Sequence, residues 1–139
     1  MSRTAHCQCE SLRVEAQGAY EAVVACSCSA CQRRTGSVFG VGVYYPRTQL
    51  TLAGESREYV RIADSGQPFR SHFCPTCGTT VYWSSDRDPS RIGIAVGAFA
   101  DPTFPAPNRS VFEINKHHWV DFGADIAGFE RGRDSRKLR

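Results

Sequence analysis

The seven cysteines constrain this chain of 139 residues more than any other feature, because they fall into three tight clusters. The clusters are Cys7 with Cys9, Cys26 with Cys28 and Cys31, and Cys74 with Cys77. Thiolates one or two residues apart on a tight turn can both point at one zinc ion, which prefers four ligands in a tetrahedron. Gly78, directly after the last pair, suits such a turn because glycine adopts conformations closed to other residues. The pattern therefore predicts zinc binding.

The spacing leaves two ways of pairing these clusters. In the first, the two pairs form one closed site and the cluster of three stands alone: the sets are Cys7, Cys9, Cys74 and Cys77, and Cys26, Cys28 and Cys31. Three protein ligands with a free fourth position is the arrangement of a catalytic zinc. In the second, a single ribbon-like site uses Cys28, Cys31, Cys74 and Cys77. We favour two sites, because a single site leaves a Cys-x-Cys pair without a role.

The rest of the sequence favours strands. Apolar and polar residues alternate in 12–16, 59–62 and 80–83, as in strands with one face on a core. Residues 22–26, 38–45 and 92–96 are rich in β-branched or aromatic side chains, and glycine or proline punctuates the gaps. No segment has the pattern of a three-turn amphipathic helix. We expect a mainly β fold of antiparallel sheets, in a single domain over residues 1–139.

The net charge of +3 is concentrated at the C-terminal end. Residues 131–139 hold five basic residues and one acidic residue, or +4, which leaves −1 for the other 130. We expect residues 130–139 to be a basic, flexible tail, and this balance argues against a nucleic-acid partner. No stretch has the pattern of a secretory signal or a membrane span. We therefore expect a cytoplasmic protein with no membrane partner, in which thiols stay reduced; the oligomeric state is left open.

Three segments carry a resemblance to a known family. They are HCQCESLRVE at residues 6–15, CSCSACQRRTGS at 26–37 and FCPTCGT at 73–79, and the region 114–129 around Trp119 is similar too. In this order and spacing they resemble the glutathione-dependent formaldehyde-activating enzymes, a family that includes centromere protein V. The resemblance implies a tent-like, Mss4-like fold of antiparallel sheets. It also implies a structural zinc on Cys7, Cys9, Cys74 and Cys77, and a catalytic zinc on Cys26, Cys28 and Cys31, which three ligands hold less securely than four.

An open zinc held by three thiolates suits a thiol substrate, because metal binding deprotonates a thiol. The expected function is that of a carbon–sulfur lyase, which forms or cleaves adducts between a glutathione-like thiol and a small aldehyde such as formaldehyde. The alternative is a non-catalytic zinc module that binds a protein partner or a thiol ligand. Arg33 and Arg34 are candidates to bind a substrate carboxylate. His72 is expected to be a hydrogen-bonded structural histidine, and His117 or His118 is a candidate substrate contact.

Overall fold

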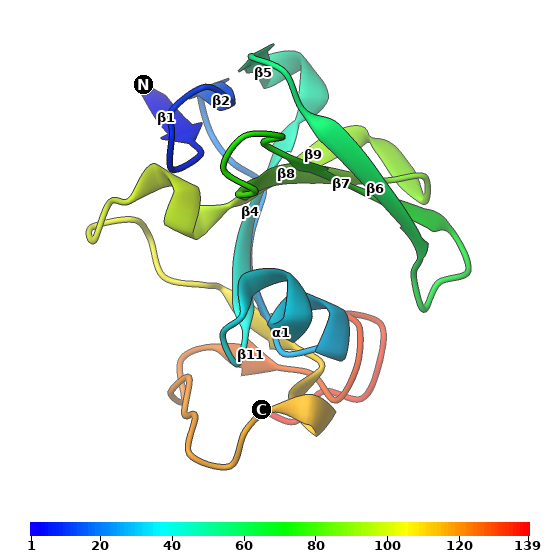
Figure 1. Ribbon diagram of the computed structural model, residues 1–139. Coiled ribbons are helices and arrows are strands. Elements are labelled where there is room, and N and C mark those ends of the chain that lie inside the picture. Colours follow the sequence, from blue (N-terminus) through cyan, green and yellow to red (C-terminus); the bar gives the residue numbers. More distant parts are fainter. The chain divides into compact units, whose positions relative to one another are not determined.

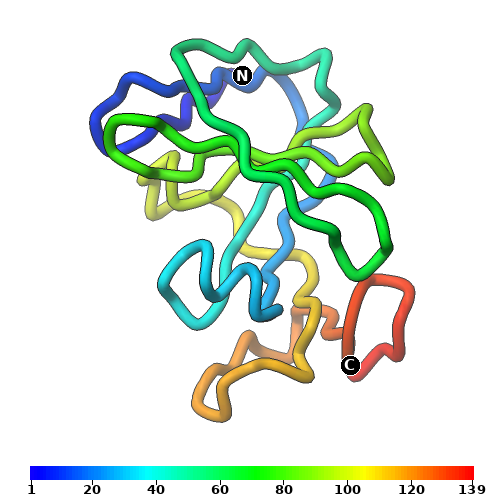
Figure 2. The backbone as a smooth tube through the Cα atoms, turned by 45° about the vertical axis from the view of Figure 1, so that its right-hand side comes forward, coloured from blue at the N-terminus to red at the C-terminus, as the bar shows by residue number.

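Strands dominate the regular structure in the computed structural model, which describes residues 1–139. The chain divides into two units, which we number here: unit 1 comprises residues 1–21 and 43–103, and unit 2 comprises residues 22–42 and 104–139. Figure 2 follows the two passages through unit 2, the first in blue to cyan and the second in yellow to red. No helix combines the length and the apolar character needed to cross a membrane.

Unit 1 begins with a three-stranded antiparallel sheet, visible as β1, β2 and β5 in Figure 1. The strands are β1 (Ser2–His6), β2 (Arg13–Gln17) and β5 (Leu50–Ala53), with β2 in the middle. Alternation along β2 buries Val14 and Ala16 and leaves the residues between them exposed. The β1–β2 turn closes through the N–H of Cys7, which donates to the carbonyl of Leu12 at 3.0 Å. This turn presents the first cysteine pair.

Four further strands of unit 1 form an antiparallel meander. They are β6 (Arg57–Ile62), β7 (Pro68–Phe73), β8 (Thr80–Ser85) and β9 (Asp88–Ala95). Its core includes the buried side chains of Val81, Trp83 and Ile94. Gly93 is opposite Trp83 in the ladder, and a Cβ there would lie 2.1 Å from the indole Nε1, so only glycine leaves room for this ring. The turn between β7 and β8 carries Cys74 and Cys77.

Unit 2 is built around a short parallel arrangement. Strand β10 (Arg109–Val111) pairs with β3 (Ala22–Cys26) and with β11 (Ala127–Gly128), parallel to both. Helix α1 (Ser29–Thr35) follows β3 almost directly and ends at Gly36, whose φ of 70° is the left-handed conformation that favours glycine. The remaining elements are β4 (Gly40–Pro46), which begins in unit 2 and ends in unit 1, and the 3₁₀ helices η1 (Arg47–Gln49), η2 (Val96–Phe99) and η3 (Glu113–Asn115).

The basic tail, residues 130–139, folds back within unit 2. Phe129 forms a β-bridge with Lys137, and the N–H of Leu138 donates to the carbonyl of Gly128 at 2.7 Å. Arg139 donates two hydrogen bonds to Glu113, at 2.7 and 2.9 Å. These contacts tie the tail to η3. The flexibility expected for it stays a prediction, as does the single-domain organisation.

The mainly β fold class predicted from the sequence is confirmed. Each of the six predicted strand segments coincides wholly or largely with a strand, and 102–107 is a loop. Two details differ. The pairings of β10 are parallel, and Pro89, one of the prolines expected to mark a gap between strands, lies near the start of β9. The start of β9 accommodates Pro89 because a strand end does not need every hydrogen bond of the ladder.

Candidate metal centres

The first cluster joins the two cysteine pairs of unit 1. Cys7 and Cys9 come from the β1–β2 turn, and Cys74 and Cys77 come from the β7–β8 turn. The four sulfur atoms all lie within 4.8 Å of one another. Cys7 and Cys74 are buried, whereas Cys9 is exposed. Two turns far apart in the sequence thus present four sulfurs to one point.

The spacing of these sulfurs fits a tetrahedral ion. Sulfurs about 2.3 Å from a zinc ion at tetrahedral corners lie roughly 3.8 Å apart. The Sγ of Cys9 is 3.6 Å from the Sγ of Cys7 and 3.6 Å from that of Cys74. Backbone amides also turn toward the sulfurs, since the N–H of Leu12 donates to Cys7 Sγ at 3.3 Å and that of Thr76 to Cys74 Sγ at 3.4 Å. Such donors stabilise thiolates.

Two hydroxyl groups border this cluster, and the sequence analysis missed both. The Oγ of Ser11 lies 3.1 Å from Cys9 Sγ and 3.2 Å from Cys74 Sγ. The Oγ1 of Thr79 lies 3.3 Å from Cys77 Sγ. Hydrogen bonding from Ser11 is the largest cause that lowers the pKa of Cys74 to about 7, and hydrogen bonding from Thr79 lowers the pKa of Cys77 to about 5. The signal in the sequence is a hydroxyl residue two positions after each pair.

The second cluster lies in unit 2, where β3 leads into α1. Cys26 ends β3, Cys28 is the N-cap residue of α1, and Cys31 lies in its first turn. Their sulfur atoms lie within 4.8 Å of one another, and all three residues are half-buried. The Sγ of Cys28 accepts a hydrogen bond from the N–H of Cys31 at 3.3 Å, so the cap itself folds the turn around the sulfurs.

Two thiols of this second cluster, those of Cys26 and Cys31, have a raised pKa. Hydrogen bonding with Cys28, then with Cys31, and then burial raise the pKa of Cys26 far above its ordinary value. The pKa of Cys31 is raised too: hydrogen bonding with Cys26 lowers it, but contact with Cys28 and burial outweigh that effect. Three thiolates repel one another unless a cation lies between them. The donor set therefore fits a soft divalent cation such as zinc.

The two arginines proposed to bind substrate differ in position. Both lie in the last turn of α1. Arg33 is exposed, whereas Arg34 is half-buried and its charge lowers the pKa of Cys31. The Nη2 of Arg34 lies 2.6 Å from where a Cβ on Gly40 would be, so the missing side chain of Gly40 makes room for the guanidinium. Of the two, Arg34 is the one whose charge reaches the cluster.

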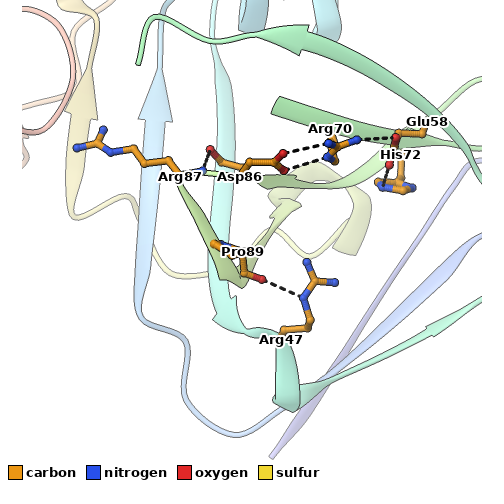
Figure 3. Close-up of polar contacts among 8 residues, drawn as sticks. Arg47, Glu58, Arg70, His72, Asp86, Arg87 and Pro89 are labelled. Atoms are coloured by element: carbon orange, nitrogen blue, oxygen red, sulfur yellow. Dashed lines mark hydrogen bonds and ion pairs between the residues drawn. The ribbon is translucent and has the colours of Figure 1, made fainter. Parts of the chain in front are cut away.

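His72 belongs to a separate polar cluster on the meander of unit 1 (Figure 3). Its Nε2 lies 3.3 Å from a carboxylate oxygen of Glu58 and its Nδ1 lies 3.1 Å from the hydroxyl of Ser56. Its ring stacks on Tyr82 with centroids 4.6 Å apart. Arg70 binds the other oxygen of Glu58 at 3.1 Å, and burial lowers the pKa of His72. These contacts agree with the hydrogen-bonded structural histidine that we expected.

The structure thus gathers the cysteines into the two sets that the sequence analysis favoured. His117 and His118 are both exposed and only His117 is hydrogen-bonded, to Gln32. Ligation of a metal by these cysteines, and substrate binding by Arg33 and Arg34, stay proposals.

The residues that carry both cysteine clusters match a known protein family. The profile of the family described as glutathione-dependent formaldehyde-activating enzyme matches residues 2–115, which include all seven cysteines. A curated protein of Emericella nidulans, provisionally named a glutathione-dependent formaldehyde-activating enzyme, is 29% identical over 79 residues. That similarity covers 55% of this chain and 40% of the relative, so the chain matches less than half the length of that protein.

The fold also has a solved relative. A crystal structure of a Rhodobacter sphaeroides protein superposes with a TM-score of 0.53 at 19% sequence identity. The superposition covers 68% of this chain and 85% of the other. At this identity the likeness concerns the fold alone.

Proposed function

Because this chain belongs to the glutathione-dependent formaldehyde-activating enzyme family, we propose that it is a zinc-dependent carbon–sulfur lyase. Its substrates are a glutathione-like thiol and a small aldehyde such as formaldehyde, or the adduct that the two form. Two zinc ions serve each chain in this proposal. One is structural, on Cys7, Cys9, Cys74 and Cys77; the other is catalytic, on Cys26, Cys28 and Cys31.

The observation that carries this proposal is the three-sulfur cluster. No fourth cysteine, histidine, aspartate or glutamate belongs to the group formed by Cys26, Cys28 and Cys31. Structural zinc sites have four protein ligands, whereas catalytic sites have three and leave a position for water or substrate. One structural and one catalytic zinc site require four and three cysteines, and these are the numbers in the clusters of unit 1 and unit 2.

The reaction adds the sulfur of a thiol to the carbonyl carbon of an aldehyde. The carbon–sulfur bond forms, the carbonyl π bond breaks, and the thiol proton ends on the aldehyde oxygen; the reverse reaction cleaves the adduct. Cys26, Cys28 and Cys31 would hold a zinc ion, and the chemistry it would supply is a lowered pKa of a substrate thiol. Arg34 offsets the negative charge of the cysteine cluster, as its effect on Cys31 indicates. Arg33, exposed one residue earlier, is proposed to bind the carboxylate of an anionic thiol, and its exposure supports this role.

The first cluster has a different part in this proposal. Its four ligands leave no free position, so the metal there contributes its binding energy to folding and takes no part in the reaction. The proposal also places the protein in the cytoplasm, where all seven cysteines stay free of disulfides, as they are in the structure. It assigns small-molecule partners only, with no membrane or nucleic-acid partner.

Zinc content and turnover of two matched cysteine variants test this function. Wild-type protein should hold two zinc ions per chain and accelerate adduct formation between glutathione and formaldehyde. Cys26→Ser should hold one zinc ion, stay folded and lose turnover, whereas Cys74→Ser should lose the folded state with its metal. One zinc ion per chain in both wild type and Cys26→Ser would remove the catalytic site. Two zinc ions without turnover of any thiol–aldehyde pair would establish a binding module instead.

A further inference from the structure

Gln32 links the exposed His117 to the cysteine turn of unit 2. It lies in α1, one residue after Cys31. Its side-chain Nε2 donates to the carbonyl of Ser27 at 2.8 Å and to the carbonyl of Asn115 at 3.3 Å. Its Oε1 lies 3.1 Å from Nε2 of His117. Because Ser27 stands between two cysteines of the cluster, two hydrogen bonds through one amide connect the histidine to the turn that carries the sulfurs.

These contacts determine how both side chains are oriented. An amide nitrogen can only donate and an amide oxygen can only accept, and the nitrogen of Gln32 already faces two carbonyls. The oxygen must therefore face His117, and Nε2 of His117 must carry the proton that it donates. In neutral imidazole the other nitrogen then has no proton. Nδ1 of His117 is thus a proton acceptor, and no hydrogen bond occupies it.

The surroundings of His117 suit a group that meets a small substrate from solvent. His117 is exposed, and its ring makes an edge-on contact with Trp119, with centroids 6.1 Å apart. Trp119 is 65% exposed, an unusual state for so large an apolar side chain. The segment before His117 is anchored, because Lys116 binds the buried carboxylate of Glu113 at 3.3 Å. An anchored loop, a fixed histidine and an open aromatic face therefore adjoin in unit 2.

We propose that His117 carries the proton between thiol and aldehyde oxygen at the three-cysteine site, and that Gln32 is the positioning residue that fixes its tautomer. This rests on the proposed function. Nδ1 of His117 takes the proton from the substrate sulfur, the sulfur bonds to the carbonyl carbon, and the same nitrogen returns the proton to the new hydroxyl oxygen. The reverse sequence releases aldehyde and thiol. The ring is unchanged overall, and no oxidant or further reactant is required.

The tautomer is tested on the zinc-loaded full-length protein without any substrate. ¹⁵N NMR of the histidine side chains should show His117 with a protonated Nε2 and an unprotonated Nδ1, widely separated in chemical shift. In Gln32→Met, which keeps the length of the side chain but removes its hydrogen bonds, the two shifts should move toward each other. The signals of His118, exposed and without a hydrogen bond, should stay where they are. Unchanged His117 signals in Gln32→Met would overturn the positioning role.

Turnover tests the proton transfer. His117→Gln keeps an N–H that can reach Gln32 but has no Nδ1, so kcat for adduct formation should fall about 100-fold or more, within the range of general acid–base catalysis. Gln32→Met should lower kcat about tenfold with KM little changed, and Gln17→Met, at an exposed glutamine of β2 in unit 1, is the matched control with wild-type kcat. Each variant should keep the zinc content of the wild type.

The outcomes separate this inference from the function it rests on. Wild-type turnover together with full turnover by zinc-loaded His117→Gln would overturn the role of His117 and leave the lyase function standing. Absence of turnover in the zinc-loaded wild type would overturn the lyase function and the proton transfer together. Loss of zinc from His117→Gln would assign the histidine to metal retention and would also overturn the proposal.

Discussion

Arg139→Ala should destabilise unit 2 much more than loss of an ordinary surface arginine. The guanidinium of Arg139 donates two hydrogen bonds, at 2.7 and 2.9 Å, to the carboxylate of Glu113. The Glu113 side chain is only 3% exposed. A Cβ on Gly128 would lie 2.6 Å from both groups, so the backbone covers this pair closely. The variant leaves a buried carboxylate with Lys116 as its remaining charged partner, at 3.3 Å.

The size of the effect follows from this geometry. Removing one partner of a fully buried ion pair costs about 3–5 kcal/mol. Lys116 still offsets part of the charge of Glu113, and the side chain of Arg139 is 29% exposed, so part of its interaction is screened by water. We therefore expect a loss of about 2–3 kcal/mol in the free energy of unfolding. For a chain of this length this is a fall of roughly 6–12 °C in Tm.

Urea denaturation at a fixed excess of zinc measures the difference, because metal binding itself shifts the apparent stability. Arg136→Ala is the matched control: Arg136 also pairs with a glutamate in the tail, Glu130 at 3.1 Å, but its side chain is 71% exposed. That variant should cost less than about 0.5 kcal/mol. Equal losses in the two variants would refute the reasoning, since burial of Glu113 would then confer no special cost.

Three further predictions use other contacts. Ser11→Ala should weaken zinc binding at the four-cysteine site about 10–100-fold in a chelator competition, whereas Ser65→Ala, on an exposed turn, should have no effect. Gly40→Ala should displace the guanidinium of Arg34 and raise KM for an anionic thiol about tenfold, as Arg34→Ala should, while neither changes zinc content. Burial raises the pKa of Glu113, but hydrogen bonding with Arg139 and the other contacts outweigh it and hold that pKa below its ordinary 4.5. The stability this gives is present above pH 4.5 and is lost as pH falls through the folded pKa, and Glu113→Gln should flatten that loss in pH-dependent unfolding.

The sequence predicted those parts of the molecule in which neighbouring residues decide the outcome. Alternation of apolar and polar residues predicted β2, β6 and β8, but only β2 alternates in burial, since β6 is largely exposed on both faces and β8 buries three consecutive residues. The cysteine pairs predicted their own turns, because two sulfurs can meet one ion only if the backbone between them bends sharply. The count of ligands that zinc accepts allowed two groupings, and sets of four and three were favoured because they give the Cys-x-Cys pair a role.

Other features depend on partners distant in sequence or on unusual chemistry. Gln32 meets Asn115 and His117 across more than eighty residues, and no local pattern marks such a contact. Strand β10 has three residues, too few for a period to show. Helix α1 begins at Cys28, whose sulfur acts as the cap, whereas the usual signals for a helix start are Ser, Thr, Asp and Asn. The sequence therefore gives no local signal for the start of this helix.

The hydroxyl groups explain why two clusters of the same residue type differ in chemistry. In unit 1, Ser11 and Thr79 give hydrogen bonds to the sulfurs and lower the pKa of Cys74 and Cys77, so negative charge is stabilised before any cation arrives. In unit 2 the thiols bond mainly to one another, and the pKa of Cys26 is raised. Thiolates in that cluster depend on the cation itself, with Arg34 as the neighbouring charge that helps. In the proposed function, four ligands with two hydroxyl-supported thiolates favour a metal that stays, whereas three ligands without such support favour a metal that keeps a position open and exchanges more readily.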